Sequence, residues 1–161
     1  MVSAAYTREE ILQLLSQIAD PEIPVVTIQE IGMLQDVHIT DDGCQVIITP
    51  TYTGCPAMGI IEADVKALLD KHGINSTVKL VYHPAWTTDN ITDVAKEKMK
   101  QYGIAPPVHS GCDVAGAEAH IACPQCGSSS TEQISRFGST ACKALYKCNE
   151  CKEPFEYFKC H

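Results

Sequence analysis

The chain of 161 residues lacks any run of eighteen apolar residues, so we expect no segment that spans a membrane. Its first residues, MVSAAYTREEI, lack a basic stretch followed by an apolar one, so we expect no secretory signal and a cytoplasmic location. Internal repeats and low-complexity tracts are also missing. The hydrophobic fraction of 45% is that of an ordinary globular protein, so long disorder is not expected.

Basic residues are scarce. The chain has 12 Lys and Arg against 20 Asp and Glu, which gives a formal net charge of −8. The acidic excess lies early, because residues 1–107 carry 7 basic and 14 acidic side chains, whereas residues 120–161 carry 5 and 4. General binding to a phosphate backbone needs a basic face, so we expect no nucleic-acid partner.

The first hundred residues alternate between helical and strand patterns. Thr7 and Glu10 form a capping box, and Asp41-Asp42-Gly43 is a turn signal between two strands. We expect helices at 7–20, 56–72 and 91–103, and strands at 33–40, 45–52 and 76–83. The order α-β-β-α-β-α predicts a small α/β domain with helices packed on one short sheet.

The segment IAPPVHSGCDVAGAEAH follows these elements and has no apolar periodicity. Adjacent prolines and small residues are typical of a linker. We therefore expect a first domain at 1–104, a linker at 105–119 and a second, small β-rich domain at 120–161.

The second domain carries two Cys-x-x-Cys pairs with 21 residues between them. In a chain without a secretory signal, such pairs bind metal more often than they form disulfides. Four thiolates at about 2.3 Å can surround a zinc ion, and about forty residues bury too little apolar surface to fold unaided. With short strands at 131–137, 144–148 and 155–160, the pattern predicts a zinc ribbon. The zinc ligands are Cys123, Cys126, Cys148 and Cys151.

Two alternatives for this cysteine set stay open, a redox dithiol and an iron–sulfur cluster. Cys142 and Cys160 exceed the four ligands, and we expect small buried residues there, with a second thiol site as the alternative. The sequence assigns no role to Cys44 or Cys112, and the terminal His161 is not expected to be a ligand.

Cys55 lies apart from these cysteines, in the stretch TYTGCPAM. At the expected start of a helix, unpaired N–H groups and the helix dipole favour a thiolate, which is a nucleophile and a metal ligand. Gly54 allows close approach of a ligand, and Thr51 and Thr53 supply hydroxyl groups. The alternative is that Cys55 extends the apolar face of the helix with Met58 as a buried thiol.

No catalytic partner for Cys55 is evident, because the histidines are scattered and none can be paired with it from sequence. The sequence therefore predicts no catalytic residues. Asp20, Glu22 and Glu30 lie in the proline-containing stretch DPEIPVVTIQEIGML, where acidic side chains are usually solvated or capping groups.

Three stretches resemble the SufT-like domain associated with iron–sulfur assembly: DPEIPVVTIQEIGML, TPTYTGCPAM and PAWTTDNITDVAKEKMKQYGIAPP. With the cysteine ribbon added, nearly the whole chain resembles the PaaD family of phenylacetate degradation, the D component of the phenylacetyl-CoA epoxidase system. The resemblance implies an α/β fold that often self-associates, so a homodimer is an expected arrangement.

By this resemblance Cys55 corresponds to the family's functional cysteine, Asp20 and Glu22 to its acidic loop, and Trp86 to its tryptophan. The implied role is an accessory factor, not an enzyme, that assists iron or iron–sulfur insertion in a multicomponent di-iron epoxidase. Zinc would be its structural cofactor, with iron or a cluster as transient cargo. The implied clients are the di-iron oxygenase or the iron–sulfur flavoprotein reductase. A structural docking subunit and a thiol-dependent enzyme are the alternatives.

Two positions depart from the family pattern. Glu30 stands where aspartate is expected before Ile-Gly, and this change is chemically mild. Asn90 stands where similar proteins tend to have an aromatic residue, which predicts a different exposed contact with partners.

Overall fold

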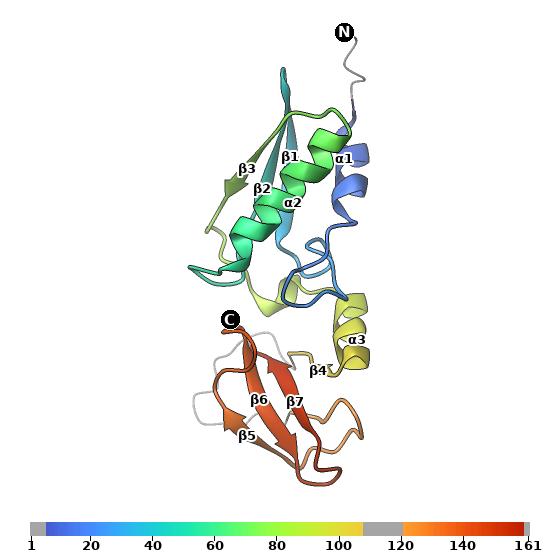
Figure 1. Ribbon diagram of the computed structural model, residues 1–161, viewed down its shortest axis with the longest axis vertical. Helices are drawn as coiled ribbons and strands as arrows, with labels where there is room; N and C mark the ends of the chain where they lie inside the picture. Colours follow the sequence, from blue (N-terminus) through green and yellow to red (C-terminus); the bar gives the residue numbers. More distant parts are fainter. Residues whose placement is uncertain (1–5, 108–120, 160–161) are drawn as a thin grey trace. The chain divides into compact units, whose positions relative to one another are not determined.

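The structure is a computed structural model that describes residues 6–107 and 121–159. Helices alternate with strands early in the chain and strands dominate later, which confirms the expected mixed α/β class (Figure 1). The chain divides into two compact units, Met1–Trp86 and Thr87–His161. No helix within 6–107 or 121–159 is both long enough and apolar enough to cross a membrane.

The first unit builds two helices on a three-stranded sheet across its described residues. Its elements are α1 (Arg8–Leu15), β1 (Leu34–Thr40), β2 (Gly43–Ile48), α2 (Ala57–Lys71) and β3 (Ser76–Leu80). β2 is the central strand, antiparallel to β1 and parallel to β3. α1 starts at the expected capping box, in which the Glu10 N–H donates to Thr7 Oγ1 at 3.2 Å.

The α1 helix ends at Leu15, earlier than the predicted end at Asp20. The Ile18 N–H donates to the Leu15 carbonyl at 3.1 Å, a three-residue bond that tightens the turn and stops the helix. The Asp20 N–H then donates to the Val26 carbonyl at 2.8 Å. The following loop therefore takes up backbone groups that a longer helix would have used.

Alternate positions of β2 face the helices, as expected for a half-buried strand. α2 buries residues three and four apart, which places them on one face; they are Ala57, Met58, Ile61, Val65 and Leu69. β2 ends at Ile48, not at residue 52, because the Thr49 N–H donates to the Met33 carbonyl at 2.8 Å and Pro50 has no N–H. The chain then turns into the loop that carries Cys55.

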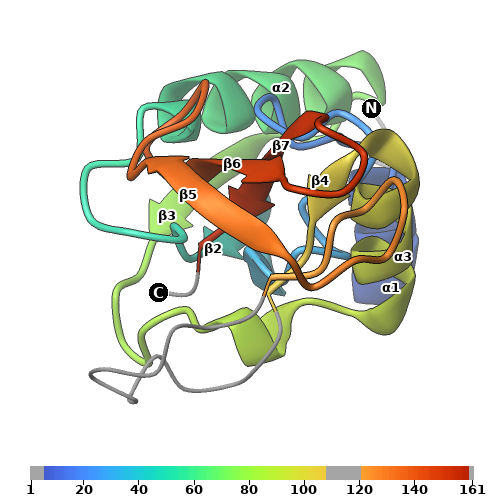
Figure 2. The same ribbon diagram turned by 90° about the horizontal axis from the view of Figure 1, so that it is seen from below.

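The second unit is built around a four-stranded sheet. Its elements are η1 (Thr88–Asn90), α3 (Asp93–Tyr102), β4 (Ile104–Ala105), β5 (Thr131–Ser135), β6 (Lys143–Cys148) and β7 (Pro154–Phe158). The strand order is β4-β7-β6-β5, and β4 lies beside β7 in both views (Figure 1 and Figure 2). Thr92 caps α3 by accepting from the Ala95 N–H at 3.2 Å, and Gly103 with φ 96° ends it.

Strand β4 was not expected from the sequence. Ile104 pairs with Glu156 and Ala105 with Tyr157, so α3 and β4 pack with the ribbon. The sequence-based division instead assigns α3 to the first domain and begins the linker at residue 105. Residues 108–120, which include most of that linker, lie outside the described residues. The domain limits of 1–104, 105–119 and 120–161 stay a prediction.

Candidate functional site

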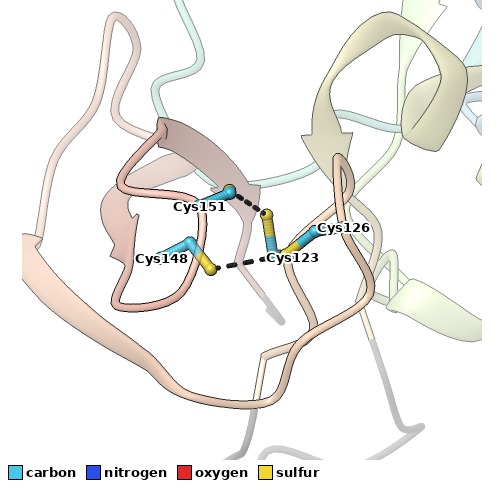
Figure 3. Close-up of side chains that lie close together, drawn as sticks. All are labelled: Cys123, Cys126, Cys148 and Cys151. Carbon is cyan, nitrogen blue, oxygen red and sulfur yellow. Dashed lines mark hydrogen bonds between the residues drawn. The ribbon is translucent and has the colours of Figure 1, made fainter.

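The four paired cysteines come together in the second unit (Figure 3). Their sulfur atoms all lie within 4.8 Å of one another. The Sγ atoms of Cys123 and Cys151 are 3.7 Å apart, and those of Cys126 and Cys148 are 3.6 Å apart. A tetrahedron with metal–sulfur bonds of about 2.3 Å has sulfur–sulfur edges of about 3.8 Å. The four side chains therefore fit a tetrahedral metal ion.

Each cysteine pair sits on a tight turn that ends in a left-handed residue. Gly127 has φ 76°, and its N–H donates to the Cys123 carbonyl at 2.8 Å. Lys152 holds the matching position after the second pair with φ 67°. A glycine adopts this conformation readily, whereas the left-handed lysine has no signal in the sequence, because a side chain is disfavoured in this region.

Neighbouring N–H groups and sulfurs shift the pKa values of two of these thiols in opposite directions. Desolvation opposes the Cys148 thiolate, but the N–H groups of Cys151 and Glu150 and the adjacent sulfurs lower its pKa to about 7. The Glu153 N–H favours the Cys151 thiolate, but desolvation and the other sulfurs outweigh it and raise the pKa of Cys151 to about 12. The thiols of Cys148 and Cys151 therefore do not ionise together near neutral pH unless a cation compensates their charge.

Two of the four cysteines form part of the core of the second unit. Cys123 and Cys148 are buried together with three apolar residues, Ala105, Ile121 and Phe155. Tyr146 packs against this group, with its ring 5.9 Å from that of Phe155. Because the apolar cluster is small, the cysteine site and the core are a single structural element.

Cys55 lies in the first unit, directly before Pro56, the N-cap of α2. The helix therefore begins one residue later than the sequence predicted. The side chain is 7% exposed, and the Cys55 N–H donates to the Tyr52 carbonyl at 3.3 Å. Gly54 adopts φ 81°, and no atom lies within 4 Å of the place where a Cβ would stand. The loop thus buries Cys55, and a side chain at the preceding position, Gly54, would meet open space.

Burial raises the pKa of the Cys55 thiol. The Ala57 N–H lowers it in part, the Glu22 carboxylate raises it further, a hydrogen bond with the Tyr52 side chain lowers it, and the Asp20 carboxylate raises it again. The net direction is upward, so the expectation that a helix start favours the thiolate is wrong for this thiol. Desolvation and nearby negative charge outweigh the backbone donor.

The acidic loop is shaped by Asp20, which is 5% exposed. Its Oδ1 accepts from the N–H groups of Glu22 and Ile23, both at 2.8 Å. Glu30 Oε2 similarly accepts from the Thr27 N–H at 3.0 Å. Capping is therefore the observed role of both side chains. The structure also brings the charges of Asp20 and Glu22 within reach of Cys55, which sequence spacing does not reveal.

The other residues of the Cys55 motif differ in their exposure to solvent. Thr51 is buried and Thr53 is exposed in the same loop. Tyr52 was missed by the sequence analysis, although it lies inside the quoted motif, three positions before the thiol. Trp86 is buried, and its Nε1–H donates to the Ile31 carbonyl at 2.9 Å, which fixes the loop that follows Glu30.

The remaining cysteines do not join either site within the described residues. Cys44 is buried in β2, and Cys142 is buried in the second unit with Thr140 Oγ1 3.0 Å from its sulfur. The expected burial of Cys142 is thus confirmed. Cys112, Cys160 and His161 lie outside the described residues.

Two known protein families match separate parts of the chain. The description "Iron-sulfur cluster assembly protein" matches residues 8–79, which include Cys55. The description "PaaD zinc beta ribbon domain" matches residues 108–159, which include the four paired cysteines. Two solved structures resemble the chain. They are a domain of unknown function from Bacillus anthracis (TM-score 0.53, 28% identity, 57% of this chain and 90% of that one) and a conserved hypothetical protein from Thermotoga maritima (TM-score 0.51, 29% identity, 61% and 98%).

The curated relatives carry names that agree with these two family matches. A protein of Escherichia coli strain K12, provisionally named as a component of 1,2-phenylacetyl-CoA epoxidase, is 47% identical over 94% of this chain and 92% of its own length. A Bacillus subtilis protein named as an Fe-S protein maturation auxiliary factor is 38% identical over 55% of this chain and 89% of its own length. The chain therefore belongs to the PaaD family and joins an iron–sulfur cluster assembly domain to a PaaD zinc beta ribbon.

Proposed function

We propose that this protein is an accessory maturation factor for a multicomponent di-iron phenylacetyl-CoA epoxidase in aerobic phenylacetate degradation. It assists the insertion of iron or an iron–sulfur cluster through Cys55. The observation that carries the proposal is the separation of the thiols. Four gather in the ribbon, whereas Cys55 lies alone beside Glu22 and Asp20 in the part that matches iron–sulfur assembly. Relatives named as maturation auxiliary factors support an accessory role in place of a catalytic one.

The ribbon cluster holds a structural zinc ion in this proposal. Cys123, Cys126, Cys148 and Cys151 would supply four thiolates, which leave no open position for catalysis. The ion would cross-link the two cysteine turns and neutralise thiolates that otherwise oppose one another's ionisation. Its contribution is therefore to fold the ribbon.

Cys55 acts as the transient ligand. Burial and the carboxylates of Glu22 and Asp20 keep the free thiol protonated, because both raise its pKa. The same carboxylates attract an iron cation, and a cation bound beside them removes the negative field that opposed the thiolate. The thiol proton then passes to water. One thiolate cannot complete a cluster that takes four ligands, so the client, a small thiol or a second copy supplies the rest.

The surroundings of Cys55 leave room for a client. Thr53, Gly54 and Gly59 are exposed, and no atom lies within 4 Å of a Cβ built at either glycine. Gly59 lies in the first turn of α2, four residues after Cys55. A client can therefore approach the loop and the start of α2 at these two glycines without displacing a side chain there.

The test compares the full chain with Cys55→Ser and with Cys44→Ser, a matched control for a buried thiol of the same unit. Each is purified without oxygen, zinc, iron and sulfide are measured per chain, and iron loading of the apo client is followed. We expect about one zinc per chain in all three. Iron binding and client loading are expected to fail with Cys55→Ser alone. Normal client loading by Cys55→Ser would overturn the proposal.

A structural docking subunit is the second candidate, and the low exposure of Cys55 favours it. In that case Cys55→Ala retains function, and the protein co-purifies with the oxygenase in fixed stoichiometry. A thiol-dependent enzyme is less well supported, because no histidine of residues 6–107 and 121–159 is among the groups that shift the pKa of Cys55.

A further inference from the structure

The turn between β5 and β6 presents an aromatic side chain that neither thiol site uses. Phe137 is 60% exposed, the highest fraction for any large apolar side chain in the described part of the chain. Ile134, at the bulge of β5, is 54% exposed. Apolar side chains gathered at one exposed element are typical of an interaction surface.

An ion pair between Lys143 and Glu156 stabilises this turn. Lys143 Nζ lies 2.8 Å from Glu156 Oε2, and the Lys143 side chain is only 4% exposed. The other carboxylate oxygen accepts from the Ser139 N–H, and the Gly138 N–H donates to the Lys143 carbonyl at 2.7 Å. A Cβ at Gly138 would stand 2.6 Å from Glu156 Oε1, so a side chain there would displace the carboxylate that accepts from Ser139. The turn is therefore held in one conformation before any partner binds.

One cation, Lys159, lies over the exposed ring, and a second, Arg136, precedes Phe137 in the chain. Lys159 Nζ lies 4.4 Å from the Phe137 ring centroid and donates to the Arg136 carbonyl at 2.7 Å. Arg136 is itself exposed. Neither cation forms a salt bridge with a carboxylate among residues 6–107 and 121–159. The ring is thus presented within a local excess of positive charge.

We propose that Arg136, Phe137 and Lys159 form a docking surface for the client that receives metal from Cys55. The partner surface has an apolar pocket for the ring and an acidic rim for the two cations. Aromatic and arginine side chains dominate binding hot spots, and a rigid turn lowers the ordering cost of binding. Nucleic acid is not the expected partner, because residues 120–161 carry 5 basic and 4 acidic side chains and are therefore close to neutral overall. This inference rests on the proposed function, since it names the surface used by the same client.

The test measures the Kd of the full, zinc-loaded chain for purified apo forms of the oxygenase and reductase components, at low and high salt. Phe137→Ala is expected to weaken binding to one of them about tenfold or more. Arg136→Glu is expected to weaken it and to flatten its salt dependence. Tyr102→Ala is the matched control, because Tyr102 is an aromatic residue of the same unit that is 54% exposed. Its Kd should stay unchanged.

Four outcomes of the binding measurements would overturn the docking surface: no binding of either component by the unmodified chain, an unchanged Kd for both variants, a self-association that Phe137→Ala abolishes, or displacement of the client by single-stranded RNA. Zinc content and circular dichroism check that the variants fold. Client iron loading by Cys55→Ser is scored separately. Loading that depends on Cys55 but not on Phe137 would refute the docking surface and leave the proposed function standing.

Discussion

Replacement of Asp20 by alanine is expected to destabilise the first unit by about 2–4 kcal/mol. The carboxylate is 5% exposed, and its Oδ1 accepts two backbone N–H groups at 2.8 Å. A buried donor left without an acceptor costs about 1–3 kcal/mol. Ile23 is 1% exposed, so its unpaired N–H bears that cost in full. Glu22 is half-buried, so its N–H can regain part of the lost hydrogen bonding from water. Asp20→Asn keeps a side-chain acceptor and should cost only about 1 kcal/mol.

The two Asp20 variants also separate structure from charge. Asp20→Asn removes a negative charge that raises the pKa of Cys55, so the thiol pKa is expected to fall while the turn survives. Glu22→Gln should lower the pKa of Cys55 further, because the Glu22 carboxylate has the larger effect of the two. The order of the two neutral variants is therefore a direct test of the electrostatics of the loop.

Urea unfolding followed by tryptophan fluorescence measures the stability change, since the single tryptophan, Trp86, lies in the first unit. The thiol pKa follows from the pH dependence of Cys55 alkylation, read by mass spectrometry on the peptide that contains it. If Asp20→Asn costs as much stability as Asp20→Ala, the acceptor is not what holds the turn. If either neutral variant raises the pKa of Cys55, the assigned effect of the acidic loop has the wrong sign.

Four other perturbations have defined outcomes. Because the folded pKa of Cys55 is raised, its stabilising effect is present below the unfolded thiol pKa and lost as pH rises through the folded value. The urea-derived unfolding free energy should therefore fall at alkaline pH, and less so for Cys55→Ser. Lys152→Gly should stabilise the zinc-loaded ribbon by about 1 kcal/mol in a thermal melt, because φ 67° disfavours a side chain. Gly59→Ala should stabilise the first unit by about 0.5–1 kcal/mol in the fluorescence assay, since a Cβ meets nothing within 4 Å. Chelation of the metal should remove hydrogen-exchange protection from β5, β6 and β7 while β1, β2 and β3 stay protected; uniform loss would contradict a ribbon-specific site.

Local chemistry made part of the structure predictable. The capping box of Thr7 and Glu10 and the spacing of the four ribbon cysteines depend on residues that act within a few positions or through a fixed motif. The position of β4 was not predictable, because two residues have no period and Ile104 pairs with Glu156, far away in the chain. The early end of α1 was missed for the same reason, since its competitor is a loop hydrogen bond from Asp20 to Val26.

The state of Cys55 illustrates what sequence could not supply. Its place before a helix was evident, and that place alone favours a thiolate. The outcome is reversed by burial and by the carboxylates of Glu22 and Asp20, which are more than thirty positions earlier and are aimed by the Asp20 turn. A pKa is a sum over neighbours in space, so a motif gives only the contribution of its own backbone.

The two thiol sites differ in the number of sulfurs they offer and in how readily these ionise. On the proposed function, the ribbon site suits a resident ion and Cys55 suits a transient cargo. In the ribbon, four sulfurs lie close enough to surround one ion, and backbone N–H groups already favour the Cys148 thiolate, so a metal bound there would gain chelation and depart slowly. Cys55 offers a single sulfur whose ionisation is opposed by burial and by negative charge. On the proposed function, a metal at Cys55 compensates that charge, and it is released again when the thiol regains its proton. On the proposed function this weaker hold is what a carrier needs, because a client with several ligands then outcompetes Cys55 without unfolding the ribbon.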